Sequence, residues 1–179
     1  YNLMKKAIVT GGSRGIGYGI AKMLRDEGYS VVIWHNDQFE EGAPGRKEFP
    51  EVVIDLSLGR SAAINAIFET EKIWRKGFKL DLLVNNAGIC QAKKFKDITE
   101  EEYEDMMDTN LKAPFFISST ILPWMKQDKS PKMASQIINI SSISGLQGFT
   151  GHSHYCASKF GLIGLTQVMA KELVNDGIA

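Results

Sequence analysis

The sequence has little of what marks several large classes of protein. Its only cysteines, Cys90 and Cys156, are too few for a disulfide framework and lack the spacing of metal ligands. Its 21 basic and 21 acidic residues cancel, and no basic block gives electrostatic support for binding nucleic acid or an anionic membrane. No apolar run approaches a bilayer span. We therefore expect a cytoplasmic protein with both thiols buried or lining a pocket, and with no bound metal.

Apolar, β-branched runs alternate with helical patterns along the whole chain, without a repeat or a linker. Strands are predicted over 7–10, 30–34, 51–55, 80–84 and 136–140. Strands this apolar are expected to be buried on both faces, which requires a parallel sheet covered by helices on either side. Right-handed crossovers then give the order 3-2-1-4-5 of a doubly wound parallel sheet, a three-layer α/β/α fold in one domain over residues 1–179.

Local signals place the boundaries of several elements. Two glycines and two prolines in 40–50 predict a loop, and Ser57 is a candidate cap for the helix that follows the third strand. The segment 99–102, Thr-Glu-Glu-Glu, has the form of a capping box that starts a long helix. Pro114 and Pro123 are expected to bend that helix or to end segments of it. The last helix is predicted from about Tyr155.

A glycine-rich loop, 10–17, follows the first strand and opens the first helix. Gly11 permits a tight turn, Gly15 lets the backbone approach a pyrophosphate, and Gly17 allows close contact between helix and sheet. The helix N-terminus offers N–H groups and a positive dipole to the phosphates. The loop does not end in Gly-Lys-Ser/Thr, which disfavours a P-loop nucleotidase.

Tyr155 and Lys159 are four positions apart, so their side chains share one face of the predicted helix. A lysine cation beside a phenol favours the phenolate, as a proton donor to a developing alkoxide requires. Ser142 follows the fifth strand. Since the carboxyl ends of parallel strands meet at one edge of the sheet, we expect Ser142 there together with Thr10 and Asn85.

These motifs, with Asn-Asn-Ala-Gly at 85–88 and Asn110, resemble in their order the short-chain dehydrogenase/reductase family, and in particular its 3-oxoacyl-thioester reductases. The resemblance implies a Rossmann fold and hydride transfer between a nicotinamide cofactor and a carbonyl or alcohol, without a metal. It implies that Tyr155 is the acid/base, that Ser142 bonds the substrate oxygen, and that Lys159 binds the nicotinamide ribose. Asn110 would hold a water in the proton relay.

The resemblance also implies further cofactor contacts in the glycine loop, at the ends of the second and third strands, and in the motif at 85–88. These residues are Gly11, Ser13, Arg14, Gly15, Ile16, Gly17, His35, Asn36, Asp55, Leu56, Asn86, Ala87 and Gly88. Two interpretations of Asp55 stay open, a contact to the adenine ring and a turn that starts the following helix.

The choice between NADP and NAD depends on the end of the second strand. Enzymes of this fold that use NAD usually carry an acid there, and this chain has His35 at the expected position. Arg14 lies where relatives that prefer NADP carry a basic residue. We therefore predict NADP, with NAD as the alternative if Asp37 reaches the ribose.

His152 and His154 flank the catalytic tyrosine, but no carboxylate or cysteine completes a set of metal ligands. We expect both histidines at the mouth of the substrate site, with Leu146, Gln147 and Phe149.

In the resembled family a further strand and a substrate lid follow the last helix, whereas this sequence stops where a sixth strand is expected. An unpaired edge on the fifth strand is therefore predicted, in a domain incomplete at its C-terminus. The alternative function is a nucleotide-binding, redox-sensing module without turnover. Expected substrates are 3-oxoacyl thioesters or small ketones, with sugars, polyols and steroids left open.

Apolar stripes on the two long helices predict a homodimer or a homotetramer. They include Met106, Met107, Leu111, Phe115, Leu162, Leu165 and Met169.

Overall fold

A computed structural model describes residues 4–36, 42–126 and 135–179. Within these ranges the chain forms one parallel sheet of five strands in the order β3-β2-β1-β4-β5, which confirms the predicted order. The strands are β1 (Lys6–Thr10), β2 (Ser30–His35), β3 (Glu51–Val53), β4 (Leu82–Asn85) and β5 (Gln136–Asn139).

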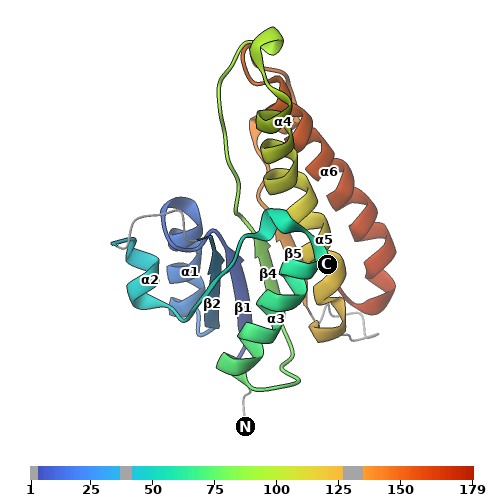
Figure 1. Cartoon of the computed structure of the whole chain (residues 1–179). Helices are drawn as coiled ribbons and strands as arrows, with labels where there is room; N and C mark the ends of the chain where they lie inside the picture. Colours follow the sequence, from blue (N-terminus) through green and yellow to red (C-terminus); the bar gives the residue numbers. More distant parts are fainter. Residues whose placement is uncertain (1–3, 37–41, 127–134) are drawn as a thin grey trace.

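Helices cover both faces of this sheet (Figure 1). They are α1 (Gly15–Asp26), α2 (Pro44–Glu48), α3 (Arg60–Trp74), α4 (Glu100–Met107), α5 (Ala113–Ile121) and α6 (Ser153–Leu173). Neighbouring residues of β1 point to opposite faces, as the period of a strand requires. Ile8 belongs to a core that α3 and α5 complete, and Val9 belongs to a second core that contains Ala21 and Leu24 of α1. The result is the predicted doubly wound α/β/α arrangement.

The predicted loop over 40–50 is wrong in its second half, because α2 forms there. Pro44 stands at the start of this helix, where a missing N–H costs nothing. The amide of Gly45 donates to the carbonyl of Ser13 at 2.9 Å, so α2 is tied to the glycine loop. Residues 37–41, which include Asp37, lie outside the described part of the chain.

The start of α3 also differs from the prediction. The carboxylate of Asp55 accepts hydrogen bonds from the amide and hydroxyl of Ser57, and this closes a short 3₁₀ turn, η1 (Leu56–Leu58). Gly59 follows with a φ of 80°, and α3 begins only at Arg60. Ser57 is therefore part of the turn and does not cap the helix.

The capping box at Thr99 and Glu102 is confirmed. The predicted long helix is divided, as Pro114 and Pro123 led us to expect. A π-helical turn, η3 (Asp108–Lys112), joins α4 to α5, and a 3₁₀ turn, η4 (Leu122–Trp124), follows α5.

The outer strand β5 differs from its neighbours. It was predicted to be buried on both faces, but Ile138 is 42% exposed, because β5 is the last full strand of the described sheet. Its outer edge is not wholly unpaired, contrary to the prediction. Ile178 forms a parallel bridge with Ser135, and the amide of Ile137 donates to the carbonyl of Ala179 at 2.8 Å. The end of the chain therefore starts to extend the sheet.

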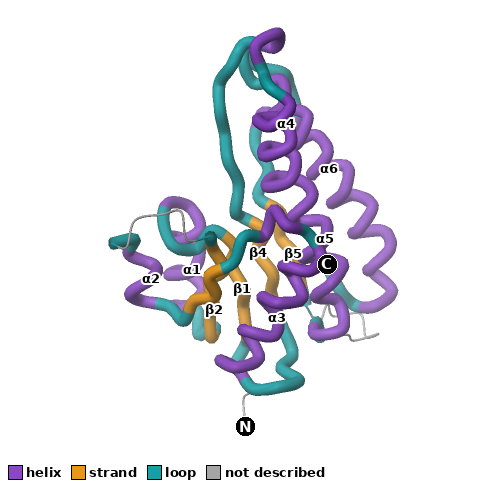
Figure 2. Tube along the Cα trace, viewed as in Figure 1, coloured by secondary structure: helices purple, strands orange, loops and turns teal. Residues whose placement is uncertain are grey.

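Loops that leave β4 and β5 rise beyond the carboxyl ends of the strands, and with them rise α4 and the start of α6 (Figure 2). The candidate site lies at this edge of the sheet.

Candidate active site

The glycine loop leads from β1 into α1, and Arg14, Gly15 and Ile16 at the start of the helix are exposed. Gly11 and Gly15 have φ values of 65° and 56°, which favour glycine, and a Cβ at Gly15 would meet no atom within 4 Å. Within the described ranges no side chain caps α1, and its first turn contains no acidic residue. The free N–H groups and the dipole of a 12-residue helix thus face open space. This arrangement fits a pyrophosphate.

The loop is held against the end of β4 by hydrogen bonds. Thr10 Oγ1 accepts from the amides of Asn86 and Ala87, both at 3.0 Å. The side-chain amide of Asn86 donates in return to the carbonyl of Thr10 at 3.0 Å. A Cβ on Gly17 would lie 2.2 Å from the carbonyl oxygen of Gly11, so only glycine allows α1 to dock this closely. The main role of Asn86 and Ala87 seen here is therefore to hold the glycine loop against the end of β4.

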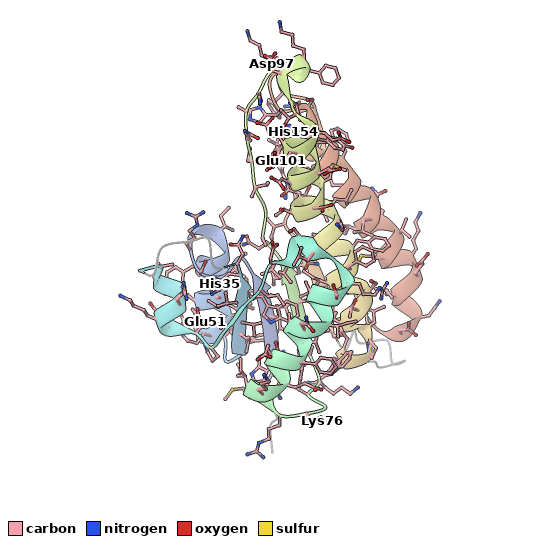
Figure 3. The ribbon with its side chains drawn as sticks, viewed as in Figure 1. His35, Glu51, Lys76, Asp97, Glu101 and His154 are labelled. Atoms are coloured by element: carbon pink, nitrogen blue, oxygen red, sulfur yellow. The ribbon has the colours of Figure 1, made fainter. Side chains whose placement is uncertain are left out.

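The end of β2 differs from what the resemblance implied for His35. Its ring is buried, and both nitrogens bond within the chain, Nε2 to Glu51 Oε2 and Nδ1 to the carbonyl of Asn36, each at 2.9 Å. Arg46 Nε donates to the same oxygen of Glu51 at 3.2 Å. Figure 3 shows His35 and Glu51 beside each other near α2. His35 thus has no ring nitrogen to offer, whereas Oδ1 of Asn36 is buried without a partner among the described residues.

The other predicted contacts of the glycine loop divide by exposure. Arg14 is exposed and immediately precedes α1, and Ile16 is 70% exposed. Ser13 is buried beneath the start of α2. Asp55 and Leu56, for which the resemblance implied contacts with the cofactor, have structural partners instead. The Asp55 carboxylate closes the turn before α3, and the Leu56 side chain belongs to the core.

Tyr155 and Lys159 occupy one turn at the start of α6, as predicted from their spacing. Lys159 Nζ lies 5.8 Å from the centre of the Tyr155 ring and donates to the carbonyl of Ile140 at 2.9 Å. The lysine is only 5% exposed, and this burial lowers the pKa of its ammonium group. A Cβ on Gly88 would lie 3.7 Å from Nζ, so the exposed backbone of Gly88 leaves room beside the ammonium.

The two neighbouring serines after β5 differ in their hydrogen bonds. Ser141 donates its hydroxyl hydrogen to the carbonyl of Lys159 at 3.3 Å. Ser142 Oγ accepts from the amide of Ser144 at 3.1 Å and has no acceptor for its own hydrogen among the described residues. Ser142 is half-buried, as is Tyr155, so both hydroxyls can reach a bound molecule. These properties suit Ser142 to donating a hydrogen bond.

Asn110 lies in the π-helical turn η3 and is fully buried. Its side-chain oxygen accepts from the amide of Ile89 at 2.8 Å, and its amide donates to the carbonyl of Ile89 at 2.9 Å. It also donates to Ser158 Oγ at 3.2 Å. Ser158 was missed by the sequence analysis, because a serine inside a helix gives no signal of a tertiary partner.

His154 does not lie at an open mouth, contrary to expectation. It is 2% exposed, and neither ring nitrogen has a hydrogen-bond partner in the described ranges. Burial lowers the pKa of its imidazole, an effect that the negative charge of Glu102 partly opposes. His154, labelled in Figure 3, lies at the start of α6. It lines a cleft of about 400 Å³ between the starts of α4 and α6, with Phe95 and Tyr103 among the other lining residues. His152 is partly exposed.

Other expectations concerned thiols, metals and exposed apolar residues. Cys156 is buried as expected, whereas Cys90 is exposed. The described residues contain no group of three or more His, Cys, Asp or Glu side chains that could hold a metal ion. No helix in the same ranges is long and apolar enough to cross a bilayer. Leu146 and Phe149, which follow Ser142 in the sequence, are exposed, and their place at the substrate site stays a prediction.

Known proteins resemble this chain over nearly its whole length. The family model described as short chain dehydrogenase matches residues 5–179. The 3-oxoacyl-[acyl-carrier-protein] reductase of Staphylococcus aureus is 36% identical over 98% of this chain and 71% of its own length. The enzyme of the same name from Chlamydia muridarum is 34% identical over 97% of this chain and 70% of its own length. The chain therefore belongs to the short-chain dehydrogenase family, whose members are oxidoreductases that use a nicotinamide cofactor.

Proposed function

We propose that this protein reduces a carbonyl group to an alcohol, with Tyr155 as the proton donor. The observation that carries the proposal is the turn that sets the Tyr155 phenol beside the buried Lys159 ammonium, together with the half-buried hydroxyl of Ser142. These groups come from the loop after β5 and from α6, at the carboxyl edge of the sheet, where the glycine loop also follows β1.

Each residue has its own role in the proposed reduction. A bound nicotinamide supplies the hydride. As hydride reaches the carbonyl carbon, negative charge grows on the oxygen, and Ser142 and Tyr155 stabilise it by donating hydrogen bonds. Tyr155 then gives up its phenolic proton, and the Lys159 cation stabilises the phenolate that remains. The carboxamide of Asn110 holds the segment after β4 through both bonds to Ile89, and the relay water implied by the resemblance would lie next to it.

The substrate we favour is a 3-oxoacyl thioester. Two relatives are 3-oxoacyl-[acyl-carrier-protein] reductases, and the exposed apolar side chains of Leu146 and Phe149, which follow Ser142 in the sequence, suit an acyl chain better than a sugar. Small ketones are the simpler alternative.

The experiment is turnover of 3-oxobutanoyl-CoA by the full-length protein and by its Tyr155→Phe variant. Loss of the phenolic proton donor should lower kcat by about 10³-fold or more while reduced cofactor still binds. Turnover within tenfold of the unaltered protein would remove the mechanism.

NADP is the cofactor that we propose, with NAD as the alternative. Arg14 lies exposed at the glycine loop, where it can meet an extra phosphate, and the end of β2 carries His35 in place of an acid. Titration by fluorescence should show tighter binding of NADPH than of NADH. Replacement of Arg14 by alanine should lower the affinity for NADPH about tenfold and leave the affinity for NADH nearly unchanged. Equal affinities in the unaltered protein would contradict the assignment.

The proposal extends to assembly and location. Tyr103, Phe115, Phe160 and Val168 on α4, α5 and α6 are each at least 46% exposed, which supports a homodimer or homotetramer. Met106 and Leu162, which the sequence placed in the same stripes, are instead buried within the chain. Light scattering would test the oligomeric state.

The proposal also includes one dinucleotide-binding domain over residues 1–179, which the continuous sheet supports. It further includes a cytoplasmic location, which the balanced charge supports.

A further inference from the structure

Ser158 belongs to the catalytic turn, residues 155–159 of α6, and is bonded to Asn110, but the proposed mechanism does not use it. Its side chain is fully buried. Its hydroxyl donates to the carbonyl of Tyr155 at 2.7 Å and accepts from Nδ2 of Asn110 at 3.2 Å. A hydroxyl has one hydrogen, which Tyr155 receives, so the oxygen remains as the acceptor for Asn110. The bonds therefore run in one direction, from amide to hydroxyl to carbonyl, and each polarises the next.

The bond from Asn110 is the informative one. Helical serines often donate to a carbonyl three or four residues earlier, so the bond to Tyr155 by itself is common. Asn110 is 48 residues away and comes from the π-helical turn η3, a kind of irregularity that is frequent at functional sites. One of its amide hydrogens goes to Ile89, and the other faces Ser158 Oγ and the sulfur of Met106. Since a thioether is a weak acceptor, Ser158 supplies the stronger partner for that hydrogen.

The catalytic turn is thus held from two sides. On the side of β5, Lys159 donates to the carbonyl of Ile140, and its own carbonyl accepts from Ser141. On the side of β4, the chain of hydrogen bonds from Ile89 through Asn110 reaches the turn, among the described residues, through Ser158 alone. Loss of the Ser158 hydroxyl would leave the first attachment intact and break the second.

We propose that Ser158 is a positioning residue whose hydroxyl fixes the Tyr155 turn relative to Asn110 and Ile89. The inference rests on the proposed function, because it takes Tyr155 as the proton donor. Its effect should fall on the chemical step, since small misplacements of a reacting group can cost about 100-fold in rate. Binding of the cofactor depends chiefly on the glycine loop and should change little.

The test compares Ser158→Ala with Ser118→Ala in the full-length protein. Ser118 is a matched control, because it too is a buried serine that accepts from a buried asparagine, Asn85, at 3.0 Å. With 3-oxobutanoyl-CoA, Ser158→Ala should lower kcat about 10- to 100-fold and change the Kd of the reduced cofactor less than about threefold. Ser118→Ala should lose a similar amount of thermal stability and keep kcat.

Two further measurements keep the outcome clear. The loss from Ser158→Ala should nearly vanish in an Asn110→Ala background, because both changes break the same chain of bonds. Hydrogen exchange, which needs no turnover, should speed up in peptides that cover 155–159 and Ile89 in Ser158→Ala but not in Ser118→Ala. Unchanged exchange, or equal losses of kcat in the two serine variants, overturns the positioning role. Full activity in Tyr155→Phe would instead overturn the proposed function.

Discussion

The glycine loop after β1 and the catalytic turn of α6 lie at the same edge of the sheet, but they are built from different parts of the chain. The loop presents backbone N–H groups and depends on side chains being absent, as at Gly15 and Gly17. The catalytic turn presents the side chains of Tyr155 and Lys159 and depends on buried partners such as Ile140 and Ser158.

Because of this difference, the glycine loop and the catalytic turn are sensitive to different substitutions. The loop is determined by a few consecutive residues, so a single added methyl group can disrupt it. The turn draws on β5, η3 and the segment after β4, and its partners lie far away in the sequence.

Gly17→Ala should be the most damaging change to the loop. Its Cβ would lie 2.2 Å from the carbonyl oxygen of Gly11 and 2.4 Å from the side-chain nitrogen of Asn86, so α1 must shift away from the sheet. We expect a loss of about 3 kcal/mol or more in the free energy of unfolding, and no measurable cofactor binding. Chemical denaturation and fluorescence titration would measure both.

Gly19→Ala is the control on the same helix, because a Cβ there would meet no atom within 4 Å. It should raise helix stability by up to about 1 kcal/mol and leave cofactor binding intact. If Gly17→Ala behaved in the same way, the close docking of α1 would not matter to the site.

Thr10→Val should weaken the link between the glycine loop and the segment after β4. The substitution keeps the shape of the side chain but removes the oxygen that accepts from the amides of Asn86 and Ala87. Leaving these donors without a partner should cost about 2–3 kcal/mol in urea denaturation. Thr120→Val is the matched control, since the Thr120 hydroxyl is buried and has no partner among the described residues. That control should be neutral or stabilising, and a cost equal to that of Thr10→Val would count against the predicted link.

His154→Leu should have the smallest effect and should make the protein more stable. Burial lowers the pKa of His154 below its ordinary value of 6.5, so below that pH the unfolded chain binds more protons than the folded chain. Stability is therefore lost as the pH falls from 6.5 towards the lower folded pKa. In His154→Leu the melting temperature should be higher and should fall less steeply as the pH is lowered below 6.5. His152→Leu serves as the control and should keep the steep fall.

Much of the site could be predicted from short motifs, because their geometry is local. Four-residue spacing on a helix brings Tyr155 beside Lys159 in any context, and the Thr99 capping box formed as predicted. The inward-turned ring of His35 could not be predicted, since its partner Glu51 lies on another strand. Neither could α2, whose short sequence becomes helical against the glycine loop.

The strand order follows from apolar periodicity and from the right-handedness of crossovers between parallel strands. The backbone of the glycine loop and the pairing of Tyr155 with Lys159 follow from steric rules that act within a few residues. By contrast, three features depend on how distant segments pack: the bond from Ser141 to Lys159, the bond from Asn110 to Ser158, and the burial of His154 with no hydrogen-bond partner among the described residues. The physical reason is that hydrogen-bond partners and burial depend on which distant segments meet. Such contacts form only when β4, β5, α4 and α6 pack together.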